Sequence, residues 1–222
     1  MTVSRQSYPG SDEATTVAQV ERAQLCDLFD EVGPHAPTLC RPWDTHHLAA
    51  HLVAREGSPL GLLSMLRPKS AGEDIERLVA DRDFAALVDE LRGGPPTMSV
   101  FGTGLTDRLG NGLEFFVHHE DVRRALPGFD PRELPVWAAD QLWQGLTFAA
   151  RGLMRKAPVG AALRRSDTGQ LAVGSKKART VIVAGPVPEL ALFAFGRGAV
   201  ADVDLDGSPE DVAALRGTRF GL

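Results

Sequence analysis

The feature that most constrains the fold of this 222-residue chain is a change of periodicity near Pro158. Before it, apolar residues recur every three to four positions, which is the spacing of helices that bury one face. After it, short apolar segments such as "RTVIVAG" are separated by turn residues, which is typical of strands. Helices followed by strands favour an α+β fold over a parallel α/β fold, in which the two types alternate.

The first part of the chain predicts a helix bundle. In "VAQVERAQLCDLFDEV" the apolar residues lie close to one helical stripe, and the next helix has a start signal because Asp44 can cap it. Glycine and proline clusters separate the segments. The expected helices cover about 17–32, 44–56, 72–91 and 104–126. Four amphipathic helices with connections of mixed length indicate a four-helix bundle.

The second part predicts a small α+β domain that follows a proline-rich linker at 127–135. A bridging helix is expected at about 136–154. Strands are expected at 161–167, 169–175, 179–185 and 199–205, with short helices at 186–196 and 208–216. We therefore divide the chain into a bundle, residues 1–130, and a second domain, residues 131–222, which includes the bridging helix.

Charge and composition exclude several classes of function. The net charge is −5 and the basic residues are scattered, so the basic face of a nucleic-acid-binding protein is not expected. No apolar run approaches the ~18 residues of a membrane helix, and no signal peptide is evident. Cys26 and Cys40 lie far apart and form no CxxC pair. These features predict a cytoplasmic protein, and they leave its oligomeric state open.

The segment "LEFFVHHEDVRRAL", residues 113–126, contains the side chains best suited to metal binding or catalysis. Glu114, His118 and Asp121 have the spacing i, i+4 and i+7, so they share one stripe of a helix. This stripe adjoins an apolar one, which places Glu114 and His118 at the edge of the bundle core. His119 and Glu120 point elsewhere and are expected to be solvated.

The helix at 44–56 offers a further donor. His47 and His51 are also spaced i, i+4, and His51 lies between two leucines on the inward half. His51, Glu114 and His118 would form a set of two histidines and one carboxylate with coordination positions left open, as in catalytic metal sites. Asp121 could then orient a ligand. The alternative from the residues alone is a group of hydrogen-bonded packing side chains, and whether His47 contributes stays open.

Three segments resemble the mycothiol-dependent maleylpyruvate isomerase family, which belongs to the DinB-like metal-binding four-helix bundles. "PWDTHHLAAHLVARE" matches the family's first motif, in which His51 would be a ligand. "LEFFVHHEDVRRAL" matches its E-x-x-x-H-x-x-D motif, in which Glu114 and His118 complete the ligand set and Asp121 is the trailing acid. "VIVAGPVPELALFAFGRGAVADVDLDG" resembles its carboxy-terminal module.

This resemblance implies a divalent metal, with zinc as the expected ion, and mycothiol as the thiol cosubstrate. It implies that the ion holds the thiol as a thiolate, which adds to an electrophilic small molecule in an isomerase or transferase reaction. Arg197 is the catalytic candidate for the substrate's anionic end, and Asp121 is the second catalytic candidate. Arg55 is a weaker alternative for the anionic end and is expected to be a surface residue. Nothing in the sequence identifies the substrate.

Two other functions remain open at this point. A metal-assisted hydrolase would use bound water in place of the thiol, with Asp121 as the base. A non-catalytic protein would use the metal or the histidines for stability and would bind a ligand in its second domain.

Overall fold

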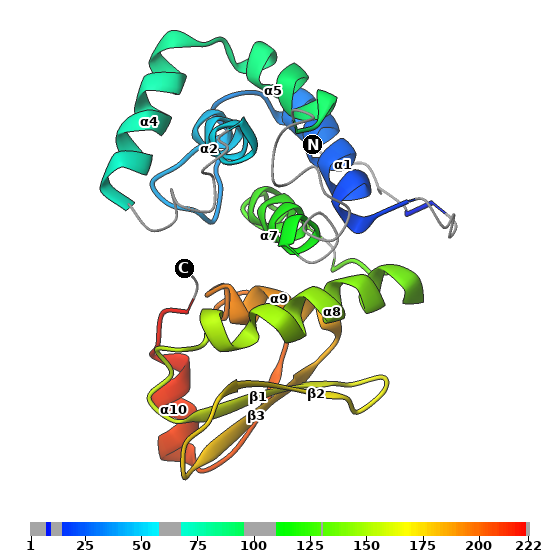
Figure 1. The fold of residues 1–222 in the computed structure, drawn as a ribbon, viewed down its shortest axis with the longest axis vertical. Coiled ribbons are helices and arrows are strands. Elements are labelled where there is room, and N and C mark those ends of the chain that lie inside the picture. Colours follow the sequence, from blue (N-terminus) through cyan, green and yellow to red (C-terminus); the bar gives the residue numbers. More distant parts are fainter. Residues whose placement is uncertain (1–7, 10–14, 58–67, 96–109, 130, 221–222) are drawn as a thin grey trace. The chain divides into compact units, whose positions relative to one another are not determined.

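The computed structural model describes residues 8–9, 15–57, 68–95, 110–129 and 131–220 and has an α+β fold. Helices dominate the first part of the chain, and the second part contains a four-stranded sheet (Figure 1). The chain divides into two compact units, Met1–Pro131 and Arg132–Leu222. The α+β class expected from the change of periodicity is therefore confirmed. Within the described residues, no helix is both long and apolar enough to cross a membrane.

Local signals explain where the first helices begin and end. Helix α1, Val17–Val32, starts with a capping box in which the side chains of Thr16 and Gln19 satisfy each other's backbone N–H groups. It ends at Gly33, whose φ of 75° is a left-handed value that favours glycine. Helix α2, Thr45–Gly57, is capped by Asp44 as expected, because the Asp44 carboxylate accepts a 3.1 Å hydrogen bond from the His47 N–H.

The helix expected at 72–91 is two helices. Helix α4 covers Pro68–Asp81 and helix α5 covers Phe84–Gly93. Asp83 between them has extended backbone angles, and its carboxylate accepts a hydrogen bond from the Ala85 N–H, so it caps α5. The prediction of a single helix was wrong because the backbone breaks at Asp83. On one continuous helix, the apolar residues of α4 (Ile75, Leu78 and Val79) would lie on the side opposite to those of α5 (Phe84, Leu87, Val88 and Leu91), so the apolar pattern itself changes phase at the break.

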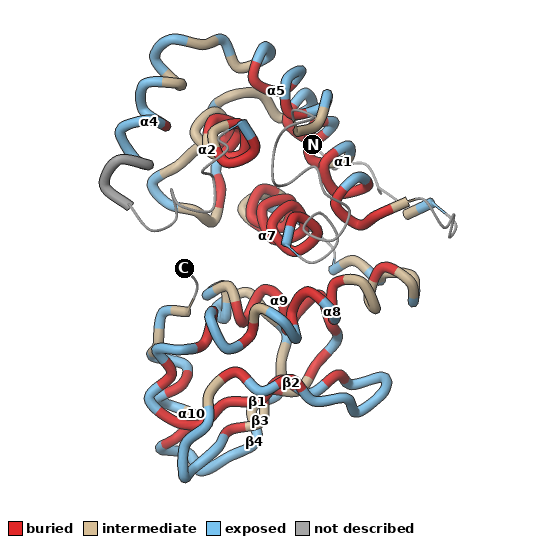
Figure 2. The backbone as a smooth tube through the Cα atoms, in the orientation of Figure 1, coloured by how far each residue is buried: buried red, intermediate tan, exposed pale blue. Residues whose placement is uncertain are grey.

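Helix α7, Gly112–Arg123, is the most deeply buried element of the first unit (Figure 2). The expected helix at 104–126 corresponds to it, although residues 104–109 lie outside the described part of the chain. His119 and Glu120, expected to be solvated, are buried. His119 Nδ1 lies 2.6 Å from Glu21 on α1, and Glu120 pairs with Arg124 at 2.6 Å. The expectation failed because α1 packs against the side of α7 that an isolated amphipathic helix would leave in water.

The apolar core of the first unit joins α1, α2, α4, α5 and α7. Its largest fully buried side chains are aromatic and leucine residues from these helices, which exclude water from the space between them. The members with the greatest volume are Phe29, Phe115, Leu25, Leu28, Leu48, Leu52, Leu87 and Leu91. Since α2 and α7 are both fixed by this core, polar side chains at its edge are held in defined positions.

The second unit is a mixed sheet with helices packed on it. Its strands are β1 Gly160–Arg165, β2 Leu171–Ser175, β3 Thr180–Gly185 and β4 Asp204–Asp206, in the order β2-β1-β3-β4. Strands β1 and β3 are parallel, whereas the other two pairs are antiparallel. Helices α8, Val136–Leu153, and α9, Val187–Ala194, pack on each other and on the sheet (Figure 1). Helix α10, Pro209–Arg216, packs against β3.

Candidate metal centre

Two helices of the first unit bring the predicted donor residues together. Helix α2 supplies His51, and α7 supplies Glu114 and His118 from adjacent turns. Glu114 Oε1 lies 3.5 Å from His51 Nε2 and 3.3 Å from His118 Nε2. The rings of the two histidines are 5.2 Å apart at an angle of 74°. One ligand atom from each residue therefore lies within 4.8 Å of the others.

These separations fit a shared ion. Nitrogen and oxygen ligands bound at about 2.0–2.2 Å to one tetrahedral ion lie roughly 3.3–3.5 Å apart. The separations of Glu114 from both histidines fall in that range. The His51 side chain is 25% exposed, so small molecules can reach the group from that side. Two imidazoles and a carboxylate are a donor set that suits zinc and similar divalent ions.

Nearby charges favour the ionised form of Glu114. Burial alone would raise the pKa of this carboxyl, but the positive charge of Arg55 and hydrogen bonds to His118 and His51 hold it well below its usual value. Burial lowers the pKa of His51 and outweighs the hydrogen bond to Glu114, which favours the neutral imidazole. An ionised carboxylate beside a neutral imidazole is the protonation state in which both can bind a cation.

Arg55 is buried beside the candidate site and is not a surface residue, contrary to the sequence-based expectation. Its side chain is buried, with Nε 3.6 Å from Glu114 Oε1 and Nη1 donating a 2.7 Å hydrogen bond to Asn111. The expectation was wrong because Arg55, one turn after His51, follows the inward stripe of α2 and not its wet face. Asn111, which the sequence analysis did not single out, anchors the guanidinium from the start of α7.

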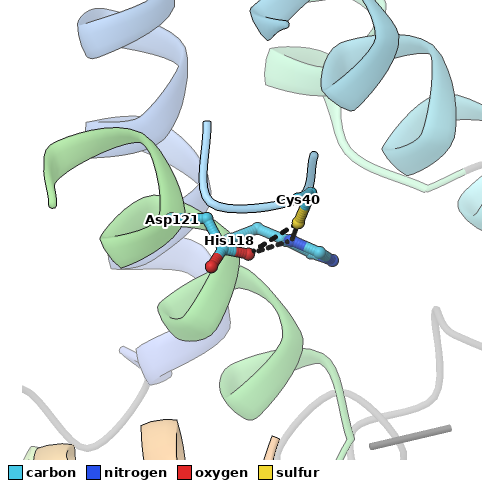
Figure 3. Close-up of side chains that lie close together, drawn as sticks. All are labelled: Cys40, His118 and Asp121. Carbon is cyan, nitrogen blue, oxygen red and sulfur yellow. Dashed lines mark hydrogen bonds and ion pairs between the residues drawn. The ribbon is translucent and has the colours of Figure 1, made fainter. Parts of the chain in front are cut away.

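His118 has a second set of contacts on its other ring nitrogen. His118 Nδ1 lies 2.9 Å from Asp121 Oδ2, and the Cys40 Sγ is 2.9 Å from the same oxygen and 3.7 Å from Nδ1 (Figure 3). Burial would lower the pKa of His118, but hydrogen bonds to Asp121, Cys40 and Glu114 raise it well above its usual value. Asp121 is completely buried. Its contact with His118 agrees with the shared stripe expected from the helical spacing, and its orienting role stays a prediction.

Cys40 was missed because it lies in the connection between α1 and α2, where no periodicity places it, and 78 residues separate it from His118. Cys40 lies only two residues before the "PWDTHHLAAHL" motif, and this closeness is the signal in the sequence that could have identified it.

His47 is engaged elsewhere. Its Nδ1 lies 2.6 Å from the Asp44 carboxylate that caps α2, and its Nε2 is 3.8 Å from Glu76 on α4. No group of metal-donor residues found in the described residues includes it. Arg197 belongs to the second unit, directly after α9, where its guanidinium donates a hydrogen bond to the Phe195 carbonyl. Its assignment to the substrate's anionic end stays a prediction.

The fold and the donor group together define a class: a helix bundle with a His–Glu–His cluster between two of its helices, followed by an α+β module. No protein-family model matches the sequence, and no curated protein is significantly similar to it. Among solved structures, the mycothiol-dependent maleylpyruvate isomerase matches with a TM-score of 0.58 and 14% identity, over 86% of this chain and 89% of the other. A histidine-to-alanine mutant of that isomerase matches with a TM-score of 0.60 and 13% identity over the same shares.

At this low identity the likeness establishes the fold. The chain has the fold of these isomerase structures, and the match extends over 86% of the chain. The resemblance drawn from three short segments of sequence is confirmed at the level of the fold.

Proposed function

We propose that this chain binds one divalent ion through His51, Glu114 and His118 and uses it to activate a small-molecule thiol. Zinc is the proposed ion and mycothiol the proposed thiol. The observation that carries the proposal is the set of two Glu114–histidine separations, 3.3 and 3.5 Å, which fit a shared ion. The fold-level likeness to mycothiol-dependent isomerases supports the choice of thiol.

Three protein ligands leave room for a further ligand on a tetrahedral ion, which is the arrangement of catalytic zinc sites. When bound, such an ion deprotonates a coordinated thiol, whose free pKa is about 8.5, and so makes it nucleophilic at neutral pH. Neighbouring residues of the chain fix the orientation of the proposed ligands. Asn111 anchors Arg55, whose guanidinium lies beside the Glu114 carboxylate, and Asp121 contacts His118 at its outer nitrogen.

The proposed reaction is addition of the thiol sulfur to an electrophilic carbon. In an isomerase, addition to a conjugated cis double bond leaves a single bond that can rotate, and elimination then gives the trans product and returns the thiol. In an S-transferase the same adduct is released as the product. Arg197 is proposed to bind the anionic end of the substrate, a role that the positive charge of a guanidinium suits.

Hydrolysis with Asp121 as the base is less well supported. The Asp121 carboxylate is completely buried and contacts Nδ1 of His118, whereas Nε2 of the same ring is the nitrogen that faces Glu114. A base must reach the water whose proton it takes. The position of Asp121 therefore favours an orienting role.

The experiment is to incubate zinc-loaded protein with mycothiol and a panel of electrophiles that includes maleylpyruvate, with the His51→Ala variant as the matched control. We expect an adduct or an isomer that requires both the thiol and the intact triad. Absence of product above background for every electrophile would contradict the proposal. Turnover of ester or amide substrates without a thiol would support the hydrolase, and tight ligand binding unaffected by metal removal would support a non-catalytic role.

A further inference from the structure

The connection between α1 and α2, residues 34–44, is fixed to α7 beside the proposed metal ligands. Its backbone donates a 3.0 Å hydrogen bond from the Leu39 N–H to the Asp121 carbonyl. Within the connection, the Thr38 hydroxyl donates to the Trp43 carbonyl at 2.7 Å and accepts from the Cys40 N–H at 3.1 Å. Cys40 is thus held in a defined position by backbone contacts that do not depend on its own thiol.

The thiol of Cys40 points at the outer side of His118 (Figure 3). Cys40 Sγ, Asp121 Oδ2 and His118 Nδ1 form a compact group that has the residue types of a second metal site. The distances argue for hydrogen bonds instead. The contact between His118 Nδ1 and Asp121 Oδ2 is 2.9 Å, which is an N–H···O hydrogen-bond length. The contact between Cys40 Sγ and the same oxygen is also 2.9 Å, and both are shorter than the roughly 3.3–3.5 Å between ligands of one tetrahedral ion.

We propose that Cys40 is a positioning residue for the metal ion. Its S–H donates to Asp121 Oδ2, and Asp121 accepts the Nδ1–H of His118. With Nδ1 engaged by Asp121, Nε2 is the ring nitrogen that faces Glu114 and His51, where the ion would lie, and binding of the ion displaces any proton on Nε2. This inference rests on the proposed metal site and extends it to a residue from a different part of the chain.

The same connection also supports the other histidine. The Trp43 ring lies 5.2 Å from the His51 ring, centroid to centroid, and limits the rotation of that imidazole. One segment therefore contacts both histidines of the triad, His118 through Cys40 and His51 through Trp43. Substitutions at the contacting residues of this segment should therefore change the affinity for the metal ion.

The test compares cobalt(II) binding by the full chain in wild type, Cys40→Ala and Cys40→Ser, using chelator competition and the absorption spectrum of the bound ion. Removal of an outer partner of a metal ligand costs about 10–100-fold in affinity. We expect a loss near the lower end of this range, about tenfold, in Cys40→Ala. Serine keeps a donor at the same position, so Cys40→Ser should recover most of the affinity. Circular dichroism verifies that each variant is folded.

Cys26→Ala is the matched control. Cys26 is fully buried on α1, with its thiol near the Val88 carbonyl and no contact with the triad, so its loss affects packing alone. We expect cobalt affinity close to that of wild type in this variant.

Three results would overturn the proposal. The first is wild-type affinity in Cys40→Ala, and the second is an equal loss in Cys26→Ala. The third is a near-ultraviolet sulfur-to-cobalt charge-transfer band in wild type that is absent from Cys40→Ala, because it would make Cys40 a ligand. Failure of wild type itself to bind cobalt would remove the proposed function together with this inference, whereas wild-type binding with an unchanged Cys40→Ala would remove the inference alone.

Discussion

At the scale of single residues, the candidate site depends on charges that are buried but compensated. Glu114 is largely buried, and Arg55 is the cation beside it. A charge left alone in such surroundings is costly, because the protein interior screens it much less than water does. The pair therefore holds a negative charge at the core edge in a form that a divalent ion can use.

This compensation can be measured by substitution of Arg55. In the metal-free protein, Arg55→Gln should lower the free energy of unfolding by about 3–5 kcal/mol, because it leaves Glu114 buried without its cation. Arg92→Gln is the control, since Arg92 pairs with Asp27 and Asp30 on the surface and such pairs contribute about 0–1 kcal/mol. Urea unfolding of the two variants gives the comparison. Equal losses of unfolding free energy in the two variants would show that the buried Arg55–Glu114 pair contributes no more to stability than a surface pair.

Cys26 gives a second prediction at this scale. Burial raises the pKa of its thiol from 9.0 to about 12, with a smaller opposing effect of Arg92. Between these values the unfolded chain loses the proton and the folded chain keeps it, so stability falls as pH rises. From pH 8 to pH 10 this group should lower the free energy of unfolding by about 1.4 kcal/mol. Cys26→Ala should remove that component of the pH dependence, and an unchanged profile would contradict it.

At the scale of elements, a capping residue marks the place where the single helix expected at 72–91 divides into two. Asp83 separates α4 from α5 and caps α5 through its side chain. Asp83→Ala should lower the free energy of unfolding by about 1 kcal/mol, which is typical for loss of an N-cap. Asp81→Ala, at the exposed end of α4, is the control and should change it by less than about 0.5 kcal/mol. Thermal unfolding of both variants measures the difference, and equal effects would argue against the cap.

The elements also show how far sequence reasoning reaches. Glu114, His118 and Asp121 could be predicted to share a stripe because helical spacing alone fixes their relative positions. His51 could be added because it lies on the inward half of its own helix. The division between α4 and α5 was not predicted, although the apolar pattern changes phase between Val79 and Phe84 and Asp83 is a residue type that caps helices.

Other parts of the site depend on tertiary packing and could not be derived from periodicity. Cys40 reaches His118 from an irregular connection, through backbone hydrogen bonds that no repeat encodes. His119 was misplaced for a similar reason, because its burial results from Glu21 on a helix almost one hundred residues earlier. Long-range pairing of this kind is a property of the folded chain and not of any segment.

At the scale of the whole molecule, the chain combines a helix bundle and a mixed-sheet module as two compact units. The same combination occurs in the mycothiol-dependent isomerase structures at only 13–14% identity. Core packing tolerates such divergence because many apolar side chains can fill the same volume. A metal site tolerates much less, since the identity and spacing of its donors are fixed by the ion. The proposed ligand set His51, Glu114 and His118 is therefore a stricter test of the proposed function than the fold is.

The measurement that tests the central claim most directly is the metal content of the purified full chain by elemental analysis. Wild type is compared with His51→Ala, Glu114→Gln and His118→Ala, each verified as folded by circular dichroism, and with His47→Ala as a control outside the triad. We expect about one divalent ion per chain in wild type and in His47→Ala, and almost none in the three triad variants. A wild-type protein that contains no ion and resists reloading, or triad variants that keep it, would contradict the account.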